Sequence, residues 1–201
     1  MGRRLNTITA TAAGLLIAAF AVTGCEPVDD GTESGIATAG ANGTVVESGL
    51  SQLLPPADLD GPYRVTRVID GDTFAATGPR GEVTVRMLGI DTPETKHPDK
   101  KVGCFGPEAS ANAARLLEDA TVQLQYDANA GRTDTYGRTL AYAWVDGQMV
   151  NHLQLLQGYA YEYTYDKSSP YGYRKEFRAA EKTARRAGAG LWNEATCDGK
   201  P

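Results

Sequence analysis

The chain has 201 residues, of which 41% are hydrophobic and 22% are charged, and its formal net charge at pH 7 is −5. About 130 residues have the composition of a folded domain, which is enough for a single hydrophobic core. The stretch from Gly61 to Asn193 contains 17 basic and 16 acidic residues. This near-neutral balance predicts weaker nonspecific attraction to nucleic acid than a strongly basic domain would have.

The first 25 residues have the order of parts found in an export signal. Arg3 and Arg4 precede an apolar run that includes Leu15 and Phe20, and small residues precede Cys25. Because the run is too short for a membrane span, we expect a signal peptide over residues 1–24. The sequence Val-Thr-Gly-Cys at 22–25 resembles the bacterial lipobox, whose cysteine is lipidated. The alternative is an ordinary cleaved signal peptide with an incidental cysteine.

Three cysteines are present, and their number fits a lipidated Cys25. Without Cys25, the exported chain would keep Cys104 and Cys197 as its only thiols. Two thiols in an oxidising compartment are expected to pair, so the sequence predicts a disulfide between Cys104 and Cys197.

Residues 25–60 form an acidic segment that is rich in Gly, Ser and Thr. Few large apolar side chains are available there to offset the entropy of ordering, so we expect a disordered tether before a domain at 61–193 and a C-terminal tail at 194–201. The tether has no Lys or Arg and contains seven acids: Glu26, Asp29, Asp30, Glu33, Glu47, Asp58 and Asp60.

The domain begins with the signals of a three-stranded meander. Alternating apolar residues predict strands over 63–68, 73–76 and 83–87, with a turn at 78–81 between the last two. Pro107 and Glu108 then open a helix that ends near Asp119. Strands follow at 122–126 and 139–145, joined by a loop over 127–137. Helices are expected over 149–157 and 174–187, before a short segment at 188–192.

Five short strands, a helix after the third and helices at the end are typical of a small oligonucleotide-binding barrel. The predicted fold class is therefore α+β, mainly β: a five-stranded OB-fold Greek-key barrel with about three α-helices.

Charged side chains gather near the ends of two of these strands. Asp-Gly-Asp-Thr at 70–73 and Arg-Met-Leu-Gly-Ile-Asp-Thr-Pro-Glu-Thr at 86–95 supply carboxylates and one arginine, and Arg-Thr-Asp-Thr-Tyr-Gly-Arg at 132–138 supplies a second arginine. Carboxylate oxygens suit a divalent cation, and guanidinium groups suit a phosphodiester. This combination of residue types predicts a nuclease. Read alone, Asp-Gly-Asp is more often a turn than a metal site.

The stretch from about Tyr63 to Trp192 resembles the thermonuclease family, the staphylococcal-nuclease-like domains. The resemblance rests on the segments above and on Asp-Thr-Pro-Glu-Thr-Lys-His-Pro, Phe-Gly-Pro-Glu-Ala-Ser and Gly-Leu-Trp. It implies that Ca²⁺ binds to the carboxylates of Asp72 and Asp91 and to the carbonyl of Thr92. Asp70 is expected to be a structural turn acceptor.

The resemblance also implies catalytic roles for Glu94, Arg86 and Arg138. Glu94 would act as general base or orient the attacking water, and these two roles stay open. The arginines would hold the phosphate with two donors each. Residues 132–134 are expected to build the loop that presents Arg138.

Tyrosines are the expected substrate contacts. Tyr136 matches the family tyrosine near the bound phosphate, and one of Tyr161, Tyr163 and Tyr165 is expected to stack on a base, with Tyr163 and Tyr165 preferred. The alternative is that these three alternate along one extended segment without a binding role. Lys96, His97 and Lys100 form a basic loop whose charge Asp99 reduces, and Thr135 stands where the family usually has a basic residue.

Together these features predict an exported protein that is anchored to the membrane through lipidated Cys25, and otherwise secreted. It would be a monomeric, calcium-dependent phosphodiesterase that acts on DNA and RNA, prefers single strands and leaves 3′-phosphate ends. The main alternative is a catalytically inactive OB-fold module that only binds nucleic acid.

Overall fold

The computed structural model describes residues 44–47, 50–95 and 101–197. The predicted signal peptide, Cys25 and the loop residues Lys96, His97 and Lys100 lie outside these ranges. None of the helices in the described ranges is long and apolar enough to cross a membrane. The helices are α1 (Gly106–Leu117), α2 (Val150–Leu156), α3 (Arg174–Ala187) and the 3₁₀ turn η1 (Gly190–Trp192). The strands are β1 (Thr44–Glu47), β2 (Leu50–Leu53), β3 (Asp60–Val68), β4 (Thr73–Gly78), β5 (Gly81–Met87), β6 (Ile90–Asp91), β7 (Thr121–Gln125), β8 (Thr139–Val145), β9 (Gln148–Met149) and β10 (Tyr161–Glu162).

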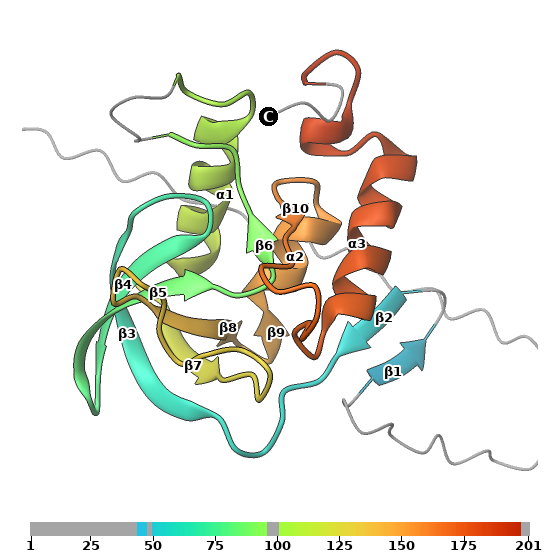
Figure 1. Cartoon of the computed structure of the whole chain (residues 1–201). Helices are drawn as coiled ribbons and strands as arrows, with labels where there is room; N and C mark the ends of the chain where they lie inside the picture. The colour runs from blue at the N-terminus through green and yellow to red at the C-terminus, as the bar shows by residue number, and fades with distance from the viewer. Residues whose placement is uncertain (1–43, 48–49, 96–100, 198–201) are drawn as a thin grey trace, which may run out of the picture. The chain divides into compact units, whose positions relative to one another are not determined.

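Five strands close into a barrel in the order β5-β4-β3-β7-β8, and β9 extends the sheet beyond β8 (Figure 1). Neighbours are antiparallel except at the closure, where β5 and β8 run parallel and Arg86 lies opposite Leu140. The mainly β fold with three α-helices and a five-stranded OB-type barrel is thereby confirmed. Gly78 is required by close packing, because a Cβ there would lie 2.3 Å from the Tyr63 ring.

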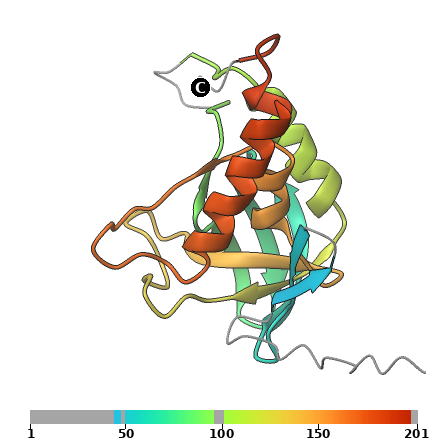
Figure 2. The same ribbon diagram turned by 90° about the vertical axis from the view of Figure 1, so that its right-hand side faces the viewer.

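Apolar side chains from the strands and helices share one core. Its largest fully buried members include Trp144, Tyr63, Tyr142, Phe74 and Phe177. α2 packs on β8 and on α3, and Figure 2 shows α3 running along α2. The Tyr142 ring meets Tyr173 edge-on at 4.9 Å and Phe177 at 5.9 Å. The barrel and the C-terminal helix are therefore held together by aromatic packing.

The folded domain begins before Gly61, inside the segment expected to be a tether. β1 and β2 pair as an antiparallel hairpin, and Leu53 is only 3% exposed in the core. The Asp60 carboxylate accepts hydrogen bonds from the hydroxyls of Tyr63 and Tyr126 and pairs with Arg80. The prediction from sequence used the average composition of residues 25–60, to which a few apolar and hydrogen-bonded residues contribute little.

A disulfide joins Cys104, just before α1, to Cys197, just after η1. It links positions 93 residues apart. The two sulfurs thus connect the start of the first helix with the end of the described chain.

A buried polar network connects two helices to the loop between β3 and β4. The Gln154 side chain in α2 is fully buried, and its Nε2 donates to the Gly71 carbonyl at 2.6 Å and to the Ala109 carbonyl at 3.3 Å. Asn112 Nδ2 in α1 donates to Gln154 Oε1 at 2.6 Å. Arg115 Nη2 completes the network by donating to Asn112 Oδ1 at 2.8 Å. Gln154 therefore fixes the loop that carries Asp70 and Asp72.

Replacing Gln154 with Leu is expected to lower the free energy of unfolding by about 1–3 kcal/mol. The buried Gly71 carbonyl would lose its hydrogen bond from Gln154, and Asn112 Nδ2 would keep only its longer bond to Gln157 Oε1 at 3.2 Å. Urea unfolding of the full chain measures this change. Gln148→Leu, at an exposed position in β9, is the control and is expected to change stability by less than about 0.5 kcal/mol. Equal stability of the two variants would show that the network is not needed.

Candidate active site

The loop between β3 and β4 is a tight turn that lies against the 91–92 segment. Asp70 Oδ1 accepts the Asp72 backbone N–H at 3.2 Å, which confirms Asp70 as a turn acceptor. A Cβ on Gly71 would lie 2.8 Å from the Thr92 side chain, so only glycine allows this approach. Burial, followed by the negative charge of Asp72, raises the pKa of Asp70 to about 6.

Arg86, in β5, joins this turn to β6. Its Nη2 lies 3.1 Å from Asp72 Oδ2 and 2.8 Å from Asp91 Oδ1. Its Nη1 donates to the Met87 and Ile90 carbonyls at 2.9 and 2.7 Å. The Arg86 side chain is 14% exposed. Both terminal nitrogens are therefore held by protein oxygens, and the single positive charge of Arg86 is shared by two carboxylates.

Asp72 and Asp91 differ in their access to solvent. Asp72 is buried, and its two oxygens accept the Thr92 N–H at 3.0 Å and the Thr73 hydroxyl at 2.8 Å. The Asp91 side chain is 52% exposed, and its strand β6 is held by antiparallel pairing of Asp91 with Tyr161 in β10. One carboxylate is thus fixed within the protein, and the other is open to water.

These donors fit a hard cation with several water ligands. Two carboxylates reach the same nitrogen, Arg86 Nη2, so their oxygens converge on one positive group. Carboxylate oxygens are ligands that a hard cation prefers. In the part of the chain that the structure describes, no three His, Cys, Asp or Glu side chains form a metal-binding group. A cation here would therefore depend on the Thr92 carbonyl, as the sequence predicts, and on water for its remaining ligands.

Glu94 follows Thr92 in a turn that neighbouring residues hold in place. Pro93 is buried, and a Cβ on Gly103 would lie 2.9 Å from its side chain. The Glu94 carbonyl accepts the Gly103 N–H at 2.7 Å, and Glu94 Oε1 accepts the Thr95 N–H at 2.9 Å. The half-buried Glu94 side chain thus follows Thr92 by two residues in a turn that is fixed at Pro93 and Gly103.

Arg138 is held by a carboxylate of its own. Asp134 accepts the Arg138 Nε–H at 2.7 Å, the Arg138 backbone N–H at 2.9 Å and the Tyr136 N–H at 2.9 Å. Although burial opposes ionisation, these hydrogen bonds lower the pKa of Asp134 below its usual value. Nη1 and Nη2 of Arg138 donate no hydrogen bond to a residue that the structure describes. The barrel closure brings Arg138 toward β5, since Leu140 lies opposite Arg86.

The four tyrosines fall into two groups. Tyr136 and Tyr165 are 84% exposed, and Tyr163 is 46% exposed. Tyr161 instead packs edge-on against Trp192 at 5.1 Å. The Arg138 guanidinium lies 5.4 Å from the centre of the Tyr136 ring. The structure thus leaves Tyr163 and Tyr165 accessible to a ligand and gives Tyr161 a packing role.

The structure brings Asp72, Arg86, Asp91 and Thr92 into direct contact. Glu94 follows this group in the chain, and Arg138 directly precedes Thr139, which lies opposite Val85 of β5. Sequence reasoning missed Gln154, whose side chain donates a hydrogen bond to the Gly71 carbonyl in the 70–72 turn. A signal for it existed, because Gln154 is a polar residue between apolar neighbours in the short helix α2.

Comparison with known proteins gives consistent matches. A family model described as staphylococcal nuclease homologue matches residues 84–194. The chain is 37% identical over 131 residues to a thermonuclease of Staphylococcus hyicus, which covers 65% of this chain and 75% of that protein. It is also 37% identical over 129 residues to endonuclease YncB of Bacillus subtilis (strain 168), which covers 64% and 60% of the two chains. The chain therefore belongs to the staphylococcal nuclease homologue family.

Proposed function

We propose that this chain is a calcium-dependent phosphodiesterase that hydrolyses DNA and RNA, prefers single strands and leaves 3′-phosphate ends. Membership of the family and the similarity to a thermonuclease and an endonuclease support a nuclease. The observation that carries the proposal is the contact of Arg86 with both Asp72 and Asp91, beside the turn that holds Glu94.

Calcium would be held by the carboxylates of Asp72 and Asp91 and by the Thr92 carbonyl. When bound, it supplies positive charge that offsets the charge on the phosphate as the phosphorus gains a fifth oxygen. Because the same two carboxylates would hold the cation, Arg86 Nη2 then becomes available to a phosphate oxygen.

Arg138 has two terminal nitrogens that can donate to the scissile phosphate, whereas those of Arg86 contact protein oxygens. Asp134 fixes its Nε and leaves Nη1 and Nη2 without a partner among the described residues, so both can bind phosphate oxygens. A lysine would offer a single point charge in place of this planar pair. The Arg138 side chain is therefore preorganised to stabilise charge that develops on the phosphate.

Glu94 is the proposed proton acceptor or orienting group for the attacking water. Its turn is fixed at Pro93 and at the hydrogen bond between the Gly103 N–H and the Glu94 carbonyl. A fixed carboxylate close to the cation-binding segment can act in either role. The attacking oxygen would form a bond to phosphorus while the bond to the 5′ oxygen breaks.

A preference for single strands follows from the accessible rings of Tyr163 and Tyr165. Unstacked bases can lie on aromatic faces, whereas paired bases are already stacked. The second candidate, an inactive nucleic-acid-binding module, needs the tyrosines but not the combination of Glu94 with two anchored arginines. Hydrolysis of single-stranded DNA separates the two candidates.

Glu94→Gln is expected to lower kcat on single-stranded DNA by about 10²-fold or more, since the amide keeps the shape but accepts no proton. The dissociation constant for the same oligonucleotide, measured by fluorescence anisotropy with chelator present, is expected to change by less than about twofold. Glu82→Gln, at an exposed position in β5, is the matched control. An activity of Glu94→Gln within threefold of the control would remove Glu94 from the mechanism.

We also propose that the mature protein is exported as a monomer and anchored through lipidated Cys25. The basic and apolar order of residues 1–24 and the Val-Thr-Gly-Cys sequence support export and lipidation. A monomer is supported because one chain supplies Asp72, Arg86 and Asp91 together. Membrane fractionation of wild type and Cys25→Ala tests the anchor: release of the variant is expected, and equal membrane binding of both proteins would contradict it.

A further inference from the structure

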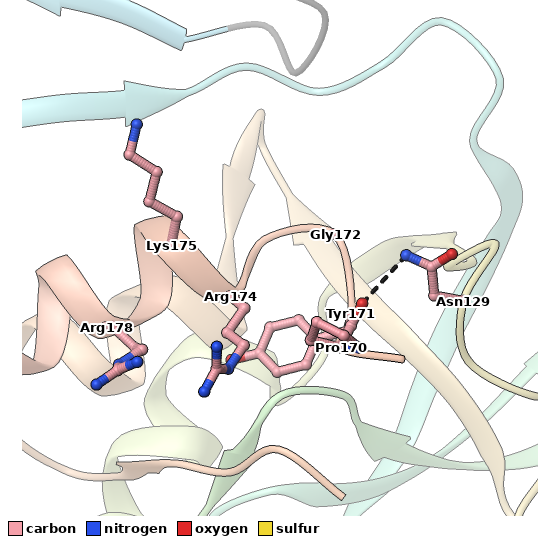
Figure 3. Close-up of a pocket in the computed structure, with 7 residues that line it drawn as sticks. All are labelled: Asn129, Pro170, Tyr171, Gly172, Arg174, Lys175 and Arg178. Atoms are coloured by element: carbon pink, nitrogen blue, oxygen red, sulfur yellow. Dashed lines mark hydrogen bonds between the residues drawn. The ribbon is translucent and has the colours of Figure 1, made fainter. Parts of the chain in front are cut away.

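A group of cationic side chains lies at the start of α3, away from the residues discussed above. Arg174, Lys175 and Arg178 line an open pocket of about 600 Å³, together with Asn129 and Gly172 (Figure 3). In that view, Arg174 and Arg178 extend from the same side of α3, one turn apart, and Lys175 points the other way. None of the three cations forms an ion pair with a carboxylate in the described ranges.

Two carboxylates near these cations, Glu162 and Glu181, are held by other groups. Glu162 Oε1 accepts the Tyr171 hydroxyl at 2.9 Å and also the Thr164 hydroxyl. Glu181 Oε1 accepts the Glu162 N–H at 3.3 Å and pairs with Arg185 at 3.1 Å. Two like charges spaced four residues apart on a helix repel each other. An anionic ligand that binds both guanidinium groups would remove this cost.

A continuous path of backbone leads from the candidate active site to Arg174. Tyr161 of β10 pairs with Asp91 of β6, and the next residues include Tyr163, whose N–H donates to the Gly89 carbonyl at 3.0 Å. Thr164 Oγ1 then accepts the Arg174 Nε–H at 2.9 Å. Thr164 lies between Tyr163 and Tyr165 in the chain, and the rings of both tyrosines are exposed. Exposed aromatic rings together with cations are typical of surfaces that bind single-stranded nucleic acid.

We propose that Arg174 and Arg178 form a second phosphate-binding subsite for a single-stranded polynucleotide that leaves the candidate active site along β10. The Nε of Arg174 is held by Thr164, and no described residue accepts a hydrogen bond from its two terminal nitrogens, which can therefore bind phosphate oxygens. Bases between the two sites would lie on Tyr163 and Tyr165. This proposal rests on the proposed function, because the polynucleotide is taken to start at the candidate active site. Binding of DNA to Arg174 and Arg178 itself does not require catalysis.

The experiment measures equilibrium binding of fluorescein-labelled single-stranded DNA of 4 and about 20 nucleotides to the full chain in chelator, so that no hydrolysis occurs. Wild type is expected to bind the long oligonucleotide more tightly than the short one. In the double variant Arg174→Gln/Arg178→Gln, the affinity for the long oligonucleotide is expected to fall about five- to tenfold, with little change for the short one. The slope of log affinity against log salt should become less steep by about 1.4, or 0.7 for each lost phosphate contact.

Arg186→Gln is the control, because Arg186 is exposed on the same helix at its other end. This variant is expected to keep the wild-type length dependence, and thermal unfolding of all proteins checks that they are folded. Equal length dependence in the double variant and the control would overturn the subsite. Binding of all proteins to anionic phosphatidylglycerol vesicles is measured in parallel. A double variant that binds both oligonucleotides like wild type but loses binding to the vesicles would also overturn the subsite. Failure of the wild type to hydrolyse DNA in calcium would instead contradict the proposed function and leave the binding result valid.

Discussion

The arrangement of the candidate site depends on one guanidinium group. Arg86 pairs through one terminal nitrogen with Asp72, which is buried, and with Asp91, which is half exposed. Its other terminal nitrogen is held by two backbone carbonyls. Removing one partner of a buried ion pair leaves an uncompensated charge and costs about 3–5 kcal/mol. Arg86 therefore holds the 70–72 turn, β5 and β6 in one arrangement, on which the proposed binding of cation and phosphate depends.

The barrel supports this arrangement from several sides. Gln154 binds the Gly71 carbonyl from α2, and β10 pairs with the strand that carries Asp91. Asp134 holds Arg138 in the same way that Asp72 and Asp91 hold Arg86, with a carboxylate that stays ionised because three hydrogen bonds favour the charged form. Each proposed phosphate-binding arginine therefore has a carboxylate that fixes its position before any substrate binds.

The sequence predicted the parts of the fold that depend on local pattern. The alternation around Val83, Val85 and Met87 indicated β5, and Pro107 marked the first turn of α1, because each signal involves residues near one another in the chain. Contacts over long separations were harder to predict. Leu53 is buried in the core, and Gln154 donates a hydrogen bond to Gly71 across 83 residues. Neither contact produces a periodic pattern in the sequence. Tyr161 and Tyr163 alternate identically in sequence, and only packing against Trp192 separates their roles.

One measurement tests most directly whether the carboxylates held by Arg86 form the calcium site. It is the rate of hydrolysis of single-stranded DNA as a function of free Ca²⁺, for wild type and Asp91→Asn. Wild type is expected to be active in Ca²⁺, inactive in chelator and poorly active in Mg²⁺, which requires regular octahedral geometry. Asp91→Asn is expected to need a higher Ca²⁺ concentration for half-maximal rate, because one charged ligand is lost. Full wild-type activity in chelator, or the same calcium dependence in both proteins, would contradict this assignment.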